Sequence, residues 1–63
     1  MRYKILINWS GEVHKLYTHS TCERRALLNA IRQLAKKLGR EVKGVRDYVM
    51  DGNYRRWEVK ADG

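Results

Sequence analysis

Residues 20–39 read STCERRALLNAIRQLAKKLG, and this pattern predicts one amphipathic helix over residues 21–38. Ser20, with Glu23 three residues later, forms a capping box, which is typical of a helix start. Gly39 suits the left-handed conformation that commonly closes a helix. One side of this helix is apolar at spacings of three and four, so we expect it to be buried against a sheet. The residues of this apolar stripe are Leu27, Ala30, Ile31, Leu34 and Leu38.

The other side of the helix is polar and contains no acid. Its cations could lie along a phosphate backbone or enter a major groove. The same residues also suit an ordinary solvated helix surface, because cations near the end of a helix complement its negative dipole. The outward row consists of Arg25, Asn29, Arg32 and Lys36, and it is widened by Lys37 and Arg40.

The chain before the helix predicts a β-hairpin. Residues 2–9 and 12–19 are rich in strand-forming residues and flank Ser10-Gly11, which is a tight-turn signal. A two-residue turn places Ile5 opposite Leu16, and opposed residues share one face of the sheet. The core face is then Tyr3, Ile5, Ile7, Trp9 and Leu16. The outer face holds Arg2, Lys4, Lys15, Tyr17 and His19, with Leu6 and Val13 as apolar exceptions.

After a connector over residues 40–44, residues 45–50 and 54–60 predict a second hairpin around Asp51-Gly52-Asn53. The length of this loop decides which side chains face inward. A two-residue turn would mix valines with charged residues on one face. A three-residue loop instead groups Val45, Val49, Trp57 and Val59, and we choose it because burial fixes the register of a strand. The outer face would then carry Arg46, Tyr48, Tyr54, Arg56 and Glu58.

The predicted fold is a single α+β domain over residues 1–63. It is a two-layer β-β-α-β-β sandwich, in which one helix packs on a four-stranded antiparallel sheet with the favoured strand order 2-1-3-4. The fourth strand carries charges that protect a sheet edge, whereas the second strand is less guarded. We therefore expect a monomer, or a dimer formed through the second strand.

The charge of the chain is its strongest compositional feature. Fourteen Lys and Arg residues stand against seven acids, which gives a net charge of +7. This balance favours polyanionic partners: nucleic acid first, acidic protein surfaces second and anionic membranes third. No stretch approaches the ~20 apolar residues of a membrane span. The single cysteine excludes an internal disulfide, so we expect a soluble cytoplasmic protein.

Three residues with reactive side chains lie close in the sequence: His14, His19 and Cys22. Zinc sites need about four ligands, usually in paired motifs, and this chain lacks a second pair. The two histidines are five residues apart on one strand, so they project to opposite faces and cannot act together on one phosphate. The sequence also lacks a Gly-rich phosphate loop, a nucleophile elbow and a carboxylate pair. We predict no catalytic residue, no metal and no cofactor.

Two surfaces are candidates for binding. One is the cationic side of the helix. The other is the outer sheet face, where tyrosines alternate with cations as they do in single-strand binders, although tyrosine is also a common residue of exposed strands. The residues of this second candidate are Lys4, Lys15, Tyr17, Arg46, Tyr48, Tyr54 and Arg56.

The sequence does not match the known nucleic-acid-binding motifs that we considered. The chain has no Phe and no aromatic RNA-recognition signature, and a helix-turn-helix would need a second helix. We therefore predict a non-catalytic nucleic-acid-binding module for DNA or RNA. The alternative is a small inhibitor or adaptor, like those of phages and mobile elements, that docks on an acidic protein surface.

Overall fold

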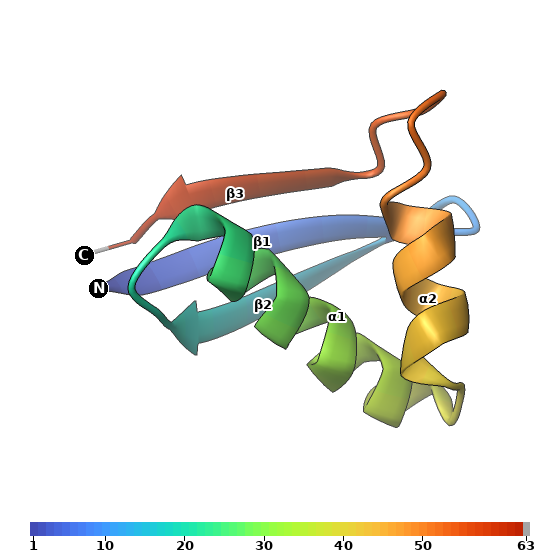
Figure 1. The fold of residues 1–63 in the computed structure, drawn as a ribbon, viewed down its shortest axis with the longest axis horizontal. Coiled ribbons are helices and arrows are strands. Elements are labelled where there is room, and N and C mark those ends of the chain that lie inside the picture. Colours follow the sequence, from blue (N-terminus) through green and yellow to red (C-terminus); the bar gives the residue numbers. More distant parts are fainter. Residues whose placement is uncertain (63) are drawn as a thin grey trace.

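The structure, a computed structural model, describes residues 1–62 as a small α+β fold with two helices and three strands (Figure 1). The strands form one antiparallel sheet in the order β2-β1-β3, so β1 is the central strand. Both helices lie on the same side of this sheet, which leaves its other face uncovered. In chain order the elements are β1 (Arg2–Trp9), β2 (Glu12–His19), α1 (Glu23–Leu38), α2 (Val42–Val49) and β3 (Trp57–Ala61).

The predicted first hairpin is confirmed, including its register. Trp9 pairs with Glu12 and Ile5 pairs with Leu16, as a two-residue turn requires. Ser10 and Gly11 both have positive φ angles, 51° and 83°, which is the requirement of a type I′ turn. The core face of β1 therefore points toward the helices, as expected.

The predicted main helix is confirmed, but its start is not. α1 begins at Glu23, and Cys22 in extended conformation precedes it without a side-chain cap. Ser20 lies before the helix: its backbone N–H donates to the Met1 carbonyl oxygen at 3.0 Å, and its Oγ accepts from the Cys22 N–H at 3.5 Å and from no N–H of α1. The expected capping box is thus wrong, since the helix begins two residues later than predicted.

The end of α1 follows the prediction. Gly39 adopts the left-handed conformation with φ of 69°. Its N–H donates to the Lys36 carbonyl oxygen at 3.2 Å, and the Arg40 N–H donates to the Ala35 carbonyl oxygen at 2.9 Å. These two bonds form a Schellman motif, which satisfies carbonyl groups at the helix end and turns the chain into α2.

The predicted third strand is wrong, because residues 42–49 form the helix α2. Val45 and Val49 are four residues apart, a spacing that places two side chains on one face of either a strand or a helix. Val42 and Tyr48 extend this pattern at helical spacing, and they are the signal that favours a helix. The sheet consequently has three strands, and β3 takes the place beside β1 that was expected for residues 45–50. The chain thus has the second helix that a helix-turn-helix requires.

The core lies between the sheet and the two helices. Ile5, Ile7 and Leu34 are completely buried, and Trp57, Val59 and Leu38 pack against them half-buried, so the predicted inward faces are confirmed. The buried core residues are Tyr3, Ile5, Ile7, Ala26, Leu27, Ala30, Ile31, Leu34, Ala35, Val45 and Val49.

The assignment of α2 as a helix has a direct test at Gly44. This glycine is exposed within α2, and a Cβ atom added there meets no other atom within 4 Å. Gly44→Ala should therefore stabilise the protein by about 0.5–1 kcal/mol, because alanine loses less backbone entropy in a helix. Urea denaturation measures the change in the free energy of unfolding.

Gly39→Ala is the matched control, because Gly39 has a positive φ angle. Alanine in this left-handed conformation costs about 1–2 kcal/mol, so this variant should be less stable. A loss of stability in Gly44→Ala as well would contradict the helical assignment.

Candidate functional site

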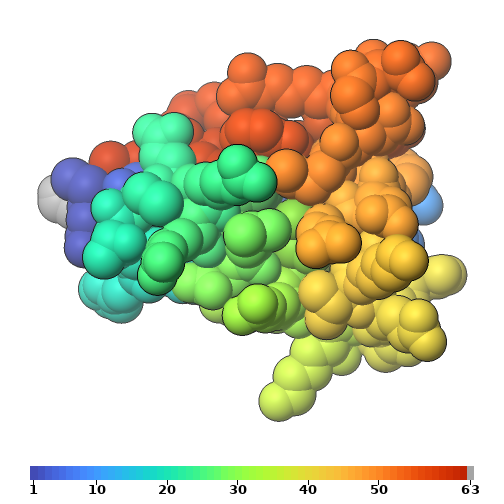
Figure 2. Space-filling view, in the orientation of Figure 1, coloured from blue at the N-terminus to red at the C-terminus, as the bar shows by residue number. Residues whose placement is uncertain are grey.

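The two helices and their connection carry a dense set of exposed cations, which we name the cationic helix layer. All eight of its cationic side chains are exposed, and none lies within 4.0 Å of an acidic oxygen among residues 1–62. Figure 2 shows α1, coloured green, across the middle of the face turned to the viewer and α2, coloured yellow to orange, to its right. The acids on the same elements are Glu23, Glu41 and Asp47. The cationic helix layer consists of Arg24, Arg25, Arg32, Lys36, Lys37, Arg40, Lys43 and Arg46.

The ion pairs of the described residues all lie outside this layer. They join Arg2 to Asp62, Arg56 to Asp51 and Lys60 to Glu58, each at 3.4 Å. The pairs of Arg2 and Lys60 are exposed and add little stability, whereas the pair of Arg56 is half-buried, and each pair cancels charge locally. Positive charge is therefore partly neutralised around the sheet and the C-terminal segment, whereas none of the eight cations of the helix layer has such an ion pair among residues 1–62.

The second predicted surface is divided by the structure. Lys4, Lys15 and Tyr17 do share the outer sheet face, where Lys4 pairs opposite Tyr17. Arg46 and Tyr48, by contrast, belong to α2. The last two residues of the set, Tyr54 and Arg56, lie in the connection between α2 and β3. The seven residues thus form no single surface, because four of them were assigned to a hairpin that does not exist.

Tyr48 is a packing residue. Its ring lies 4.7 Å from that of Trp9 at an angle of 59°, and its hydroxyl accepts a hydrogen bond from the Ser10 N–H at 3.3 Å. The guanidinium of Arg56 lies 4.1 Å from the centre of the same ring and donates to the Tyr48 carbonyl oxygen at 2.9 Å. Tyr48 and Arg56 therefore hold the end of α2 and the following loop against the first hairpin, and their prediction as outward-facing residues is wrong.

Asp51 adds to the engagement of Arg56. Its carboxylate accepts a hydrogen bond from the Asn53 backbone N–H at 2.9 Å and lies 3.4 Å from the Arg56 guanidinium. The Asn53 N–H, followed by Arg56, lowers the pKa of Asp51 from its ordinary value, so this carboxylate stays charged beside Arg56.

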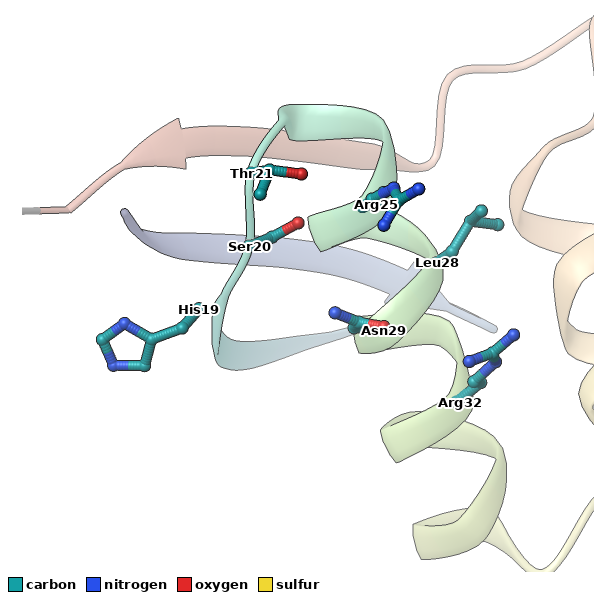
Figure 3. Close-up of a pocket in the computed structure, with 7 residues that line it drawn as sticks. All are labelled: His19, Ser20, Thr21, Arg25, Leu28, Asn29 and Arg32. Carbon is teal, nitrogen blue, oxygen red and sulfur yellow. The ribbon is translucent and has the colours of Figure 1, made fainter.

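Two hollows lie beside Leu28, one on each side of the outer ridge of α1. The first measures about 390 Å³ and is lined by the end of β2 and the outer side of α1 (Figure 3). The second measures about 340 Å³ and lies between α1 and α2. The first hollow is lined by His19, Ser20, Thr21, Arg25, Leu28, Asn29 and Arg32. The second is lined by Arg24, Leu28, Arg46, Asp47 and Met50.

The structure brings together some cations that sequence reasoning had separated. Arg25 and Arg32 face one hollow, as two members of the predicted helix row. Arg24 and Arg46 face the other, although Arg24 was not predicted and Arg46 was placed on the sheet. Arg24 could have been found only by knowing that α2 packs beside α1, since its position on the helix is at the flank of the apolar stripe.

Each of the two amide side chains of α1 donates a hydrogen bond to β2. Asn29 donates through its Nδ2 to Thr18 Oγ1 at 3.4 Å. Gln33 donates through its Nε2 to the Tyr17 carbonyl oxygen at 3.3 Å. Both bonds fasten α1 to β2, so these amides act as attachment points between the layers.

The histidines lie on opposite faces of β2, as predicted. His14 pairs opposite Ile7 on the helix side, where its Nε2 is buried without a hydrogen-bond partner among residues 1–62. His19 pairs opposite Arg2 on the outer side and is exposed. A shared role on one phosphate is therefore excluded by their placement.

Within the described part of the chain, no group of three His, Cys, Asp or Glu residues is arranged to hold a metal ion. No helix over residues 1–62 has the length and apolar character needed to cross a membrane. Comparison with protein-family models, with curated proteins and with solved structures gives no match. The features that carry a functional inference are the charge of the helix layer and the two hollows beside Leu28.

The packing role of Tyr48 can be measured against Tyr54, which is 65% exposed. Tyr48→Ala should lower the free energy of unfolding by about 1.5–3 kcal/mol, because it removes a ring packed on Trp9 and a hydrogen bond to Ser10. Tyr54→Ala should change it by less than about 1 kcal/mol. Urea denaturation of the two variants gives both values, and equal losses would show that Tyr48 is not part of the packed structure.

Proposed function

We propose that this protein is a non-catalytic nucleic-acid-binding module that uses the cationic helix layer. The proposal is supported by one observation above all: the eight exposed cations of this layer have no acidic partner within 4.0 Å among residues 1–62. Cations that lack internal partners gain most from an external polyanion, and a duplex carries about one negative charge per 1.7 Å of its axis.

The spacing of the helix row also supports this proposal. Arg25, Arg32 and Lys36 lie on the outward side of α1 and are separated by seven and four residues. An α-helix rises 1.5 Å per residue, so the row extends over roughly 16 Å. This length allows several phosphates to be contacted at once by side chains that share one rigid element. On the outer sheet face Arg2 and Lys60 are already paired with acids, so the cations without an ion pair there among residues 1–62 are Lys4 and Lys15.

The proposal predicts strongly salt-dependent binding. If about four phosphates are neutralised, the slope of log affinity against log salt concentration should be near −3.6 for duplex DNA. A fourfold rise in salt should then weaken binding by roughly two orders of magnitude. Fluorescence anisotropy with a labelled duplex at several salt concentrations measures this slope.

Two matched variants locate the binding surface. One replaces Arg25, Arg32 and Lys36 by Gln, and the control replaces Lys4, Lys15 and Lys60 by Gln. Each removes three positive charges and lowers the net charge from +7 to +4. The helix variant should lose affinity and have a flatter salt slope, whereas the control should keep a slope close to that of the wild type. Circular dichroism confirms that both variants are folded.

Equal losses in the two variants would contradict the assignment to the helix layer. No binding by the wild-type protein at low salt would end the nucleic-acid proposal, and docking on an acidic protein surface would then take its place.

A further inference from the structure

We infer that the cationic helix layer binds double-stranded nucleic acid along its phosphates and does not read the base sequence. This inference rests on the proposed function and adds the class of partner and the mode of recognition. It follows from three features of the layer: it offers no aromatic ring for stacking, its arginines lie on both sides of one helix ridge, and its amide side chains are already bonded to the sheet.

The layer lacks stacking rings. Residues 20–41, which include the whole of α1, contain no Phe, Trp or Tyr. The aromatic residue of α2 is Tyr48, whose ring is packed against Trp9 on one side and covered by the Arg56 guanidinium. Proteins that bind single strands gain about 1–3 kcal/mol from each base that stacks on an aromatic ring. The ring nearest to the cations of the layer is Trp9, which already packs on Tyr48 and lies 5.4 Å from the Arg40 guanidinium. A duplex needs no stacking ring, because its bases are already stacked.

The exposed tyrosines are elsewhere. Tyr17 lies on the outer face of the sheet, opposite Lys4 in β1, and its ring lies under the Arg2 guanidinium at 4.7 Å. Tyr54 lies in the connection after α2, with the Arg56 guanidinium 5.1 Å from its ring. These two tyrosines thus lie outside the cationic helix layer, so their rings and the charge of the layer do not act together on one strand.

The arginines flank a ridge. Leu28 lies on the outer side of α1 between the two hollows, with Arg25 and Arg32 on the side of β2. Figure 3 shows Arg25, Leu28 and Arg32 projecting from the same side of α1. Arg24 and Arg46 lie on the other side, toward α2. A groove of a duplex is bordered by two phosphate backbones, so a ridge with cations on both flanks can face the groove while each pair contacts one backbone.

The cationic helix layer has few free side chains that could recognise bases. Asn and Gln are the side chains that pair with adenine edges, and here Asn29 and Gln33 are bonded to β2. The other outward residues of α1 are cations and Leu28. Arginines can bond guanine edges as well as phosphates. Because the arginines of this layer flank Leu28 on both sides, we assign them to the two phosphate backbones, where contacts are independent of the bases.

The second helix is less suited to enter a groove. It follows α1 after only three residues, 39–41, which agrees with the general layout of a helix-turn-helix. Its outward side, however, carries Asp47 beside Lys43, and this carboxylate repels phosphates. Asp47 also lines the second hollow, and its carboxylate has no cationic nitrogen within 4.0 Å among the described residues. We therefore assign α2 to the flank of the interface, with α1 at its centre.

The test compares labelled probes of 20 base pairs or 20 nucleotides at low salt: two DNA duplexes of unrelated sequence, one RNA duplex and the corresponding single strands. The two DNA duplexes should bind within about threefold of each other, whereas a protein that reads bases separates its site from other sequences by about 10³-fold or more. Single strands should bind at least about tenfold more weakly, because they gain no stacking energy.

Paired variants test the two flanks of the ridge. Arg24→Gln with Arg46→Gln, and Arg25→Gln with Arg32→Gln, should each reduce the duplex salt slope by about 1.8, as expected for two lost phosphate contacts. Asp47→Asn should raise duplex affinity by a few-fold, because it removes an acid from the second hollow. Lys15→Gln with Lys60→Gln is the control with the same loss of charge, and its slope should stay near the wild-type value.

The outcomes separate this inference from the proposed function. Tighter binding of single strands, or more than about tenfold discrimination between the two DNA duplexes, would overturn the inference and leave a nucleic-acid-binding protein. A salt slope that only one arginine pair affects would overturn the contact with two backbones. A preference for DNA or RNA duplexes supports the inference and identifies the source of the phosphates, whereas no binding to any probe overturns the inference and the proposed function together.

Discussion

The burial of one face of β1 is the constraint on which the rest of the structure depends. Ile5 and Ile7 are completely buried, and β1 is the strand that pairs with both of its neighbours. Each such side chain contributes about 1.5–3 kcal/mol when it leaves water. A chain of 63 residues has little other apolar surface to bury, so both helices must cover this one face. The charged residues then lie on the uncovered sheet face, on the outer sides of the helices and in the connections between elements.

Two helices are needed because one cannot cover the whole face. α1 packs along β1 and β2 through its apolar stripe, and α2 covers the end near the hairpin turn with Val45 and Val49. The sharp exit at Gly39 allows α2 to turn back toward Trp9. This second helix also widens the charged surface, because Arg46 comes to lie beside Arg24 across a shared hollow. The turn after α1 therefore determines both the packing of α2 on the core and the position of its cations on the surface.

Much of the fold was predictable because its local patterns have one interpretation. The Ser10-Gly11 turn fixes the register of the hairpin, and the stripe of α1 has only the helical period. The pair Val45 and Val49 has two interpretations, and the nearby sequence Asp51-Gly52-Asn53 favoured the wrong one. The prediction that Val45 and Val49 face the core was nevertheless correct, since these valines must be buried whether the segment is a strand or a helix.

The candidate site was predictable only in part. The outward row of α1 follows from helical periodicity, and its cations are exposed as expected. The distribution of ion pairs is a tertiary property: Asp62 reaches Arg2 across nearly the whole chain, and no local pattern indicates that this pair forms. The same applies to Tyr48, whose role depends on a contact with Trp9. Which cations stay available to a partner is thus decided by the fold.

The contact between residues 2 and 62 has a consequence for how residues 1–62 can be rearranged. The Asp62 N–H donates to the Arg2 carbonyl oxygen at 2.8 Å, so residues 2 and 62 lie side by side at the end of the sheet that is remote from α2 (Figure 1). Ends that are close together and on the surface allow circular permutation. A short linker could join them, and the exposed segment 52–55 could be opened to give new termini. The rearranged chain would begin with β3, pair the same strands in the same sheet, and present the helix layer unchanged.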